Sequence, residues 1–142
     1  MKLKLKLMWL PDASFPLFDM QTNEVPSLSK EEQSFIREQL SLDTWVQSFT
    51  QEYAKWLNDE DNQVHDIHSE LNAMMIRSIE EANKLSDAFI IYYWFDIDRT
   101  YVDDFHWQYC PISGNPLIDL GENYHSLNRL ISPDFHITFP VS

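Results

Sequence analysis

Two histidines spaced three residues apart are the nearest approach to a metal site in the sequence. His65 and His68 occur in the run His-Asp-Ile-His-Ser-Glu, with Asp61 four residues before the first and Asn72 four residues after the second. On an α-helix these side chains share a narrow sector, so two imidazoles and a carboxylate would converge. The sector borders an apolar stripe, where helices normally carry solvated polar residues, and the HExxH order of zinc proteases is missing. We therefore interpret the histidines as a solvated helix shoulder and expect no metal.

Four aspartates surround a predicted turn: Asp96, Asp98, Asp103 and Asp104. Hard cations bind several oxygens, so a Mg²⁺ or Ca²⁺ site is one interpretation. Against it, Tyr101 and Trp107 stand where a calcium loop carries its glycine and its glutamate. Crowded carboxylates repel one another, and either solvent or a cationic partner relieves that repulsion. A partner-facing acidic surface and an ordinary charged turn are therefore both better interpretations than a metal site.

Cys110 is the single cysteine, which excludes an intrachain disulfide within this sequence and a multi-cysteine zinc site. On an extended segment it would share a face with His106 and Gln108, and a Cys–His pair can act as nucleophile and base. Successive side chains on such a face are about 7 Å apart, beyond direct proton transfer, so we expect a buried or half-buried thiol instead. With only two glycines, the chain also lacks a phosphate loop and a dinucleotide fingerprint. We expect neither an enzyme nor a cofactor.

The charge of the chain is its strongest functional signal. Its 142 residues include 23 acidic and 10 basic side chains, for a net charge of −13. The acidic excess is concentrated in residues 38–70 and 96–104, whereas Lys2, Lys4 and Lys6 lie at the amino end. Such a surface repels phosphate backbones and anionic lipids, which disfavours nucleic-acid and membrane binding, and it attracts cationic partners.

No segment has the pattern of a secretion or membrane signal. The first lysines alternate with leucines, and a secretory signal needs about 7–15 consecutive apolar residues. The longest apolar run, residues 88–95, is shorter than the roughly 20 residues that cross a bilayer. Together with the single thiol, this predicts a cytoplasmic protein.

The elements that must position these groups begin with a strand over residues 2–10, where leucines alternate with lysines. We expect the lysines on an outer face, where they discourage edge-to-edge pairing. Residues 11–28 contain three prolines and predict a surface loop. Ser29 and Glu32 have the spacing of a capping box, which predicts a helix as far as about residue 40.

Two longer helices and a group of strands follow. Apolar residues at steps of three and four predict helices over residues 42–57 and 64–85. The β-branched and aromatic run at 88–97 predicts a central strand, paired in an antiparallel hairpin with residues 105–110. The remaining predicted elements are a strand at 117–120, a short helix at 124–131 and a last strand at 135–141.

Strands grouped after helices indicate an α+β domain. We expect a single α+β domain over residues 1–142, with an antiparallel sheet of about four to five strands. The three main helices are expected to pack mostly on one face of that sheet.

These features together favour a small binding protein that neutralises a basic protein partner. A bacterial immunity protein, the inhibitor of a nuclease-type toxin, fits by analogy of class, because nucleases hold phosphate in cationic clefts that carboxylates and aromatics can fill. Partner contact is expected at Asp59, Glu60, Asp61, Asp66, Asp96, Asp98, Tyr101, Asp103 and Asp104.

Two alternatives belong to other classes. One is an adaptor that binds a helix or a subunit in an exposed apolar groove, covered or lined by residues 15–28. The other is a small metal-dependent hydrolase that uses His65, His68 and the carboxylates of residues 96–104. No pattern in the sequence specifies an oligomeric state.

Overall fold

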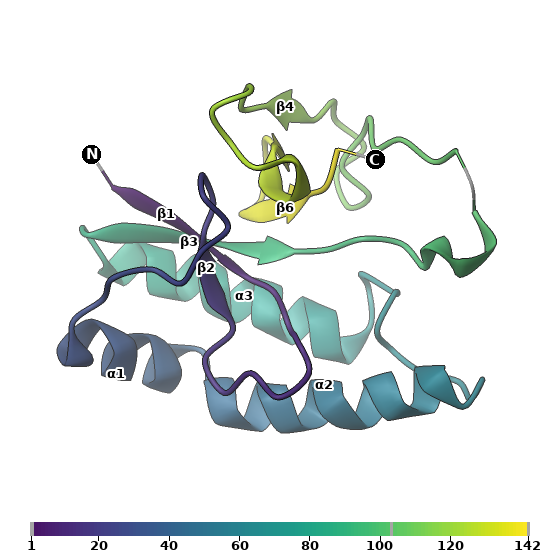
Figure 1. Cartoon of the computed structure of the whole chain (residues 1–142), viewed down its shortest axis with the longest axis horizontal. Coiled ribbons are helices and arrows are strands. Elements are labelled where there is room, and N and C mark those ends of the chain that lie inside the picture. Colours follow the sequence, from purple (N-terminus) through teal and green to yellow (C-terminus); the bar gives the residue numbers. More distant parts are fainter. Residues whose placement is uncertain (1, 103, 142) are drawn as a thin grey trace.

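The computed structural model describes residues 2–102 and 104–141, with the backbone alone at Tyr101. Three helices precede most of the strands, in an α+β arrangement (Figure 1). The elements in chain order are β1 (Leu3–Leu7), β2 (Leu17–Asp19), α1 (Lys30–Gln39), α2 (Leu42–Leu57), α3 (Glu70–Leu85), β3 (Phe89–Trp94), the 3₁₀ turn η1 (Arg99–Tyr101), β4 (Ile118–Asp119), the 3₁₀ turn η2 (Ser126–Asn128), β5 (Leu130–Ile131) and β6 (Ile137–Phe139).

The sheet is mixed and larger than the sequence suggested. Its six described strands run in the order β2-β1-β3-β6-β5-β4. β3 is parallel to both β1 and β6, and the other neighbours are antiparallel. The expectation of an antiparallel sheet of four to five strands is therefore wrong. The three helices form a long connection between β1 and β3, and such a crossover is what parallel neighbours require.

The expected hairpin between residues 88–97 and 105–110 is also wrong. β1 and β6 occupy the two sides of β3, with Leu5 opposite Ile91 and Tyr93 opposite Ile137. Within residues 105–110 the described ladder contact is a single bridge from Tyr109 to Pro116. Alternating aromatics predict an extended, half-buried segment, but they do not specify which strand it pairs with.

The first two helices confirm the predicted boundaries closely. Ser29 Oγ accepts a hydrogen bond from the Glu32 amide, and the Glu32 carboxylate accepts one from the Ser29 amide. The third helix begins at Glu70 instead of residue 64, because Ser69 caps it. Two further predictions are wrong: residues 11–28 include the strand β2, and residues 124–131 form η2 followed by β5.

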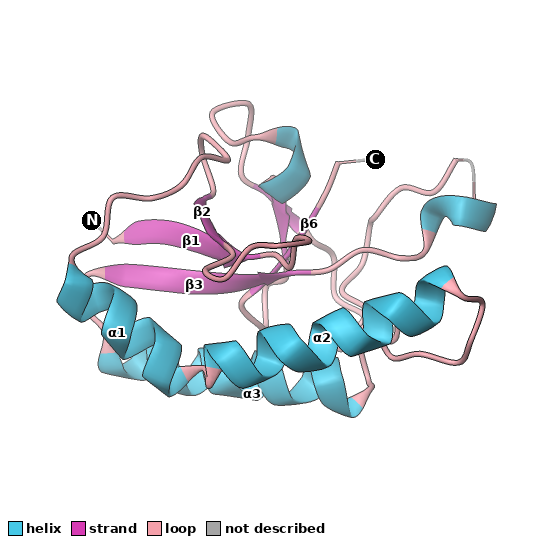
Figure 2. Cartoon of the chain, turned by 60° about the horizontal axis from the view of Figure 1, so that its bottom comes forward, coloured by secondary structure: helices cyan, strands magenta, loops and turns pink. Residues whose placement is uncertain are grey.

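The two faces of the sheet are covered by different parts of the chain. Figure 2 shows all three helices on one side of the sheet. Leu5, Leu7, Ile91 and Tyr93 belong to the buried core that packs against the helices. On the other face the chain around η2 covers the strands, and Trp94 Nε1 donates to the Leu127 carbonyl at 2.7 Å. In the described chain no helix combines the length and the apolarity needed to cross a membrane.

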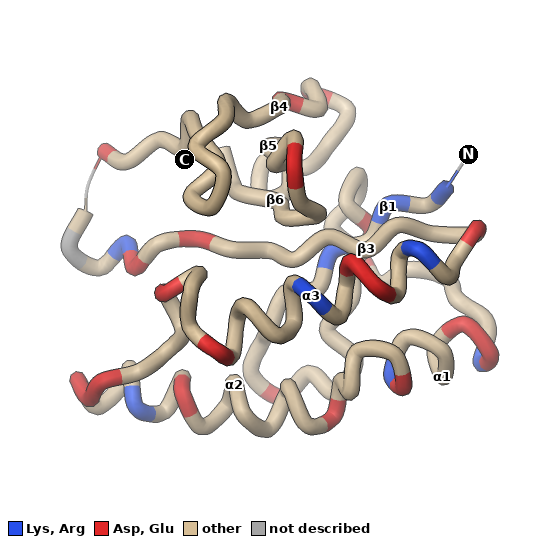
Figure 3. The backbone as a smooth tube through the Cα atoms, turned by 180° about the vertical axis from the view of Figure 1, so that it is seen from behind, with Lys and Arg blue, Asp and Glu red and all other residues tan. Residues whose placement is uncertain are grey.

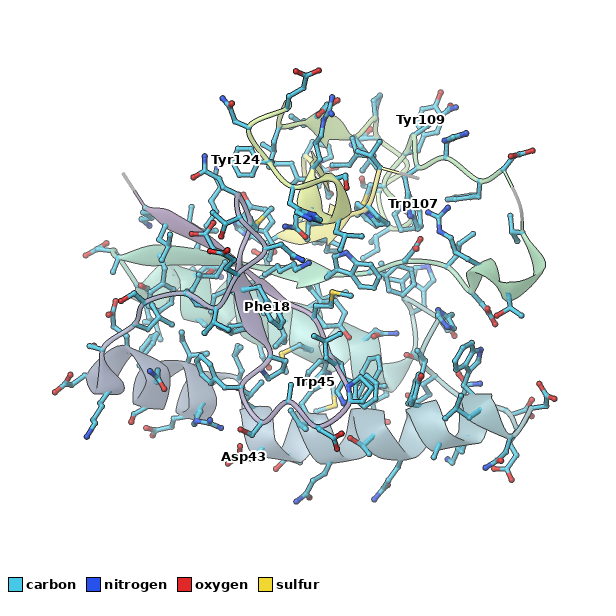
Figure 4. All side chains as sticks on the ribbon, in the orientation of Figure 1. Phe18, Asp43, Trp45, Trp107, Tyr109 and Tyr124 are labelled. Carbon is cyan, nitrogen blue, oxygen red and sulfur yellow. The ribbon has the colours of Figure 1, made fainter. Side chains whose placement is uncertain are left out.

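The expectation that the lysines of residues 2–10 all face outward is wrong for Lys6. β1 lies inside the sheet, between β2 and β3, and the Lys6 side chain is fully buried. Its Nζ lies 5.8 Å from the centre of the Phe18 ring and 6.0 Å from that of Trp94, and it has no hydrogen-bond acceptor among the described residues (Figure 4 labels Phe18). Burial lowers the pKa of Lys6 to about 8.

Candidate functional site

Two acidic loops lie side by side at one end of the molecule. The first joins α2 to α3 (residues 58–69), and the second is the described chain after β3 (residues 95–102 and 104–106). Figure 1 shows both at the end where α2 stops and η1 lies. Trp56 Nε1 donates to Asp98 Oδ2 at 2.8 Å, and His65 Nδ1 lies 3.2 Å from the Asp96 carbonyl. The rings of Trp56 and His65 pack edge to face. We call this surface the acidic end.

Polar side chains hold the first loop in shape. Asp59 has a φ of +55°, which turns the chain sharply out of α2. Glu52 Oε1 accepts a hydrogen bond from the Gln63 amide at 2.9 Å. The side-chain amide of the buried Asn72 donates to the carbonyls of Gln63, Val64 and Asp66. The loop is therefore fixed to both α2 and α3.

Both loops carry exposed carboxylates. The exposed ones are Asp59, Glu60, Asp61, Asp66 and Asp104. The nearby cations are already paired: Lys55 Nζ lies 2.8 Å from Glu52, and Arg99 Nε lies 2.7 Å from Asp96. Within the described residues no ion pair involves any of these exposed carboxylates. Figure 3 shows the acidic positions of both loops at the same end of the backbone.

Asp96 belongs to the interior of its loop. Its side chain is only 11% exposed, and it accepts two hydrogen bonds from the Arg99 guanidinium, at 2.7 and 3.0 Å. Trp107 Nε1 donates to the same carboxylate at 2.9 Å. The expected partner contact at Asp96 is therefore not favoured, because its oxygens are committed to the loop itself.

Asp98 is half-buried and remains ionised. Its oxygens accept hydrogen bonds from Thr100 and from the Trp56 indole, and these bonds lower the pKa of Asp98 to about 2. Asp98 thus ties the second loop to the end of α2 while keeping its negative charge. Two other expected contact residues lie outside the described part of the chain: all of Asp103 and the side chain of Tyr101.

The convergence of Asp61, His65, His68 and Asn72 expected on one helix sector is wrong. Residues 61–69 form turns and not a helix, so the helical spacing does not apply, and the interpretation of His65 and His68 as a solvated helix shoulder is wrong as well. Asn72 is buried and bound to loop carbonyls, whereas His68 is exposed. Among the described residues no group of three or more His, Cys, Asp or Glu side chains is arranged to hold a metal ion.

Cys110 is a buried thiol, as expected. Its sulfur accepts a hydrogen bond from Ser132 Oγ at 3.2 Å. His106 is exposed, and the segment between the two residues is not part of a described strand. The shared strand face expected for His106, Gln108 and Cys110 is therefore wrong.

A groove lies between α2 and α3, and its lining includes none of residues 15–28, the segment that was expected to cover or line an apolar groove. The groove has a volume of about 400 Å³. Its apolar lining residues are Leu40, Trp45, Leu71, Met74 and Met75, and its small hydroxyl residues are Ser41, Thr44, Ser48 and Ser78. Met74 is 50% exposed. The sequence contained one signal for this groove. The apolar stripe of α3 is wide enough to include Met74, which the sheet does not cover.

The comparisons with known proteins add no assignment. No protein-family model, no curated protein and no solved structure matches this chain. The acidic end and the groove are therefore the features from which a function can be inferred.

Proposed function

We propose that this protein binds a basic protein partner through its acidic end and thereby neutralises it. The observation that supports this most directly is the set of exposed carboxylates on two neighbouring loops, none of which forms an ion pair within the described residues. The Trp56–Asp98 hydrogen bond ties the second loop to the end of α2, where the first loop begins. The cations nearest to them, Lys55 and Arg99, are occupied by Glu52 and Asp96. The electrostatic field of this end is therefore available to a partner.

The loops are suited to fast and selective association. A field of one sign attracts an oppositely charged protein over a distance and raises the association rate by roughly 10–10³-fold. Loops already fixed by Asn72 and Trp56 lose little freedom on binding, which lowers the cost of the complex. The low pKa of Asp98 keeps its charge throughout the neutral range.

The finer proposal is that the partner is a nuclease-type bacterial toxin and that this protein is its cytoplasmic inhibitor. A nuclease exposes a cationic cleft because its substrate is a polyanion. A small acidic protein that fills such a cleft blocks the substrate without catalysis. The net charge of −13 and the two acidic loops support this class of partner.

The test compares two triple charge reversals that change the net charge equally at different places. One replaces Glu60, Asp61 and Asp104 with lysine at the acidic end and leaves Asp59 unchanged, because its positive φ disfavours lysine. The control replaces Glu24, Glu38 and Glu122, which are exposed elsewhere. Since each reversal adds two positive charges, both variants change the net charge from −13 to −7.

Each protein is immobilised and used for capture from its host's lysate at low and high salt, followed by a nuclease assay of what is captured. We expect the wild-type protein and the control to retain a basic protein at low salt and to inhibit its nuclease activity. The acidic-end variant should lose both effects. Equal retention by the two variants contradicts the proposed site, and capture unaffected by salt contradicts the electrostatic mechanism.

A further inference from the structure

The groove between α2 and α3 is an open surface between two antiparallel helices, and its exposed lining is mostly apolar. Trp45 belongs to α2, and its ring centre lies 6.0 Å from that of Tyr93 (Figure 4 labels Trp45). Leu71 and Met75 are buried, whereas Met74 is exposed beside them. The hydroxyl residues along the groove are short, so a partner's backbone can approach the apolar floor closely.

The charge along the groove is one-sided. Its lining includes Glu52 and Glu70 and no Lys or Arg. Glu52 is paired with Lys55, but Glu70 is exposed and forms no ion pair within the described chain. Gln63 lines the groove and also belongs to the first acidic loop. One end of the groove therefore opens onto the acidic end.

We propose that the groove binds a cationic amphipathic helix of the basic protein partner, an inference that rests on the proposed function. Apolar side chains of that helix lie on the floor beside Met74 and Met75. A Lys or Arg near one end of it faces Glu70, and the rest of the partner contacts the acidic loops. The groove thus selects partners by shape, whereas the loops attract them by charge.

A helix suits this surface better than an extended strand. The backbone groups of α2 and α3 are bonded within the helices, so neither offers the open edge that strand addition requires. A third helix laid between two antiparallel helices packs side-chain ridges into the groove that they form. Its anchors would recur at three- and four-residue steps, as in other helix-in-groove complexes.

The test uses a synthetic Leu/Lys amphipathic peptide of about 18 residues, which is about five helical turns. A scrambled peptide of the same composition keeps the charge and loses the apolar face. A third peptide with Glu in place of Lys keeps the face and reverses the charge. Fluorescence anisotropy measures the Kd of each, and amide shifts in NMR spectra locate the binding surface.

We expect the Leu/Lys peptide to shift the amides of groove residues and to bind at least about tenfold more tightly than either control peptide. Equal binding of the scrambled peptide overturns the proposal, because charge alone then explains the affinity. Shifts confined to the acidic loops overturn it as well.

Two matched variants locate the contact. Met74→Lys places a cation in the groove, and Leu85→Lys places one on the same helix at a residue that is 64% exposed and outside the groove. We expect Met74→Lys to weaken peptide binding at least about tenfold and Leu85→Lys to change it by less than about twofold. Circular dichroism checks that both variants keep their helices.

Equal losses in the two variants overturn the groove as the site. If the wild-type protein self-associates and Met74→Lys abolishes that, the occupant is a second copy, and the proposal is likewise overturned. Failure of the proposed function has a different signature, because the acidic-end triple variant would then still capture the native partner. The peptide measurements decide the groove separately.

Discussion

The pKa of Lys6 depends strongly on the surroundings of its ammonium group. Its ammonium group is buried on the sheet face opposite the helices and has no acceptor among the described residues. The aromatic faces of Phe18 and Trp94 offer a weak cation–π attraction, which does not replace a hydration shell. The folded protein therefore destabilises the charged form relative to the neutral amine, which lowers the pKa to about 8. The amine is thus still mostly protonated near pH 7, at an unfavourable free energy.

Replacing Lys6 with methionine is expected to stabilise the protein. A lowering of the pKa from 10.5 to about 8 corresponds to about 3 kcal/mol of unfavourable free energy when the amine is protonated. Methionine fills a similar volume without that cost. Urea denaturation near pH 7 should therefore show a higher free energy of unfolding for Lys6→Met, by up to about 3 kcal/mol.

The difference in stability between Lys6→Met and the wild-type protein is expected to depend on pH. Between about pH 8 and pH 10 the unfolded chain holds the Lys6 proton more tightly than the folded one, so the stability of the wild-type protein relative to Lys6→Met rises with pH. The advantage of Lys6→Met should therefore shrink across this range. Lys4→Met is the control on the same strand face, since Lys4 reaches the Tyr124 hydroxyl at 3.1 Å. A gain for Lys4→Met as large as that for Lys6→Met would show that removing any lysine stabilises the fold.

At the scale of elements, the acidic loop between α2 and α3 depends on one residue inside a helix. Asn72 donates to loop carbonyls and accepts a hydrogen bond from the Tyr93 hydroxyl, so it connects the loop, α3 and β3. Burial makes these bonds important, because a buried carbonyl without a donor is costly. The geometry of the acidic end is thus maintained from within the core.

Asn72→Ala is expected to loosen this loop and destabilise the fold. The loss of several buried hydrogen bonds should lower the free energy of unfolding by about 2–4 kcal/mol. Amide hydrogen exchange should also become faster in residues 63–69. Asn83→Ala is the matched control, since Asn83 bonds the backbone of Ile91 and not the loop. Equal acceleration of loop exchange in both variants would contradict the role given to Asn72.

At the scale of the whole molecule, the net charge of −13 acts against the compact state. The exposed carboxylates of the acidic end are held close together by folding, and dissolved salt screens their repulsion. A cationic partner bound at the acidic end would reduce this repulsion.

Raising the NaCl concentration from about 20 mM to about 500 mM is expected to raise the Tm, because the Debye length falls from roughly 20 Å to roughly 4 Å and the repulsion between exposed carboxylates is screened. The acidic-end triple variant should start from a higher Tm and gain less. Differential scanning calorimetry measures both effects. A Tm that falls with salt would show that attractive ion pairs outweigh the repulsion.

Local patterns in the sequence determined the first two helices and part of the site. Ser29 and Glu32 cap α1 through contacts three residues apart, and the stripe of α2 repeats along one segment, so both can be predicted without knowing the rest of the chain. The exposure of residues 59–61 likewise follows from a polar run between helices.

Tertiary structure decided what depends on distant partners. The carboxylates of Asp96 and Asp98 look alike in the sequence, yet one is neutralised by Arg99 and the other joins Trp56 of α2. Lys6 is buried between β2 and β3, beside the rings of Phe18 and Trp94, and β3 has β1 and β6 as neighbours instead of the next extended segment. Periodicity reports which face of a segment is apolar, but it carries no information about which other segment covers that face.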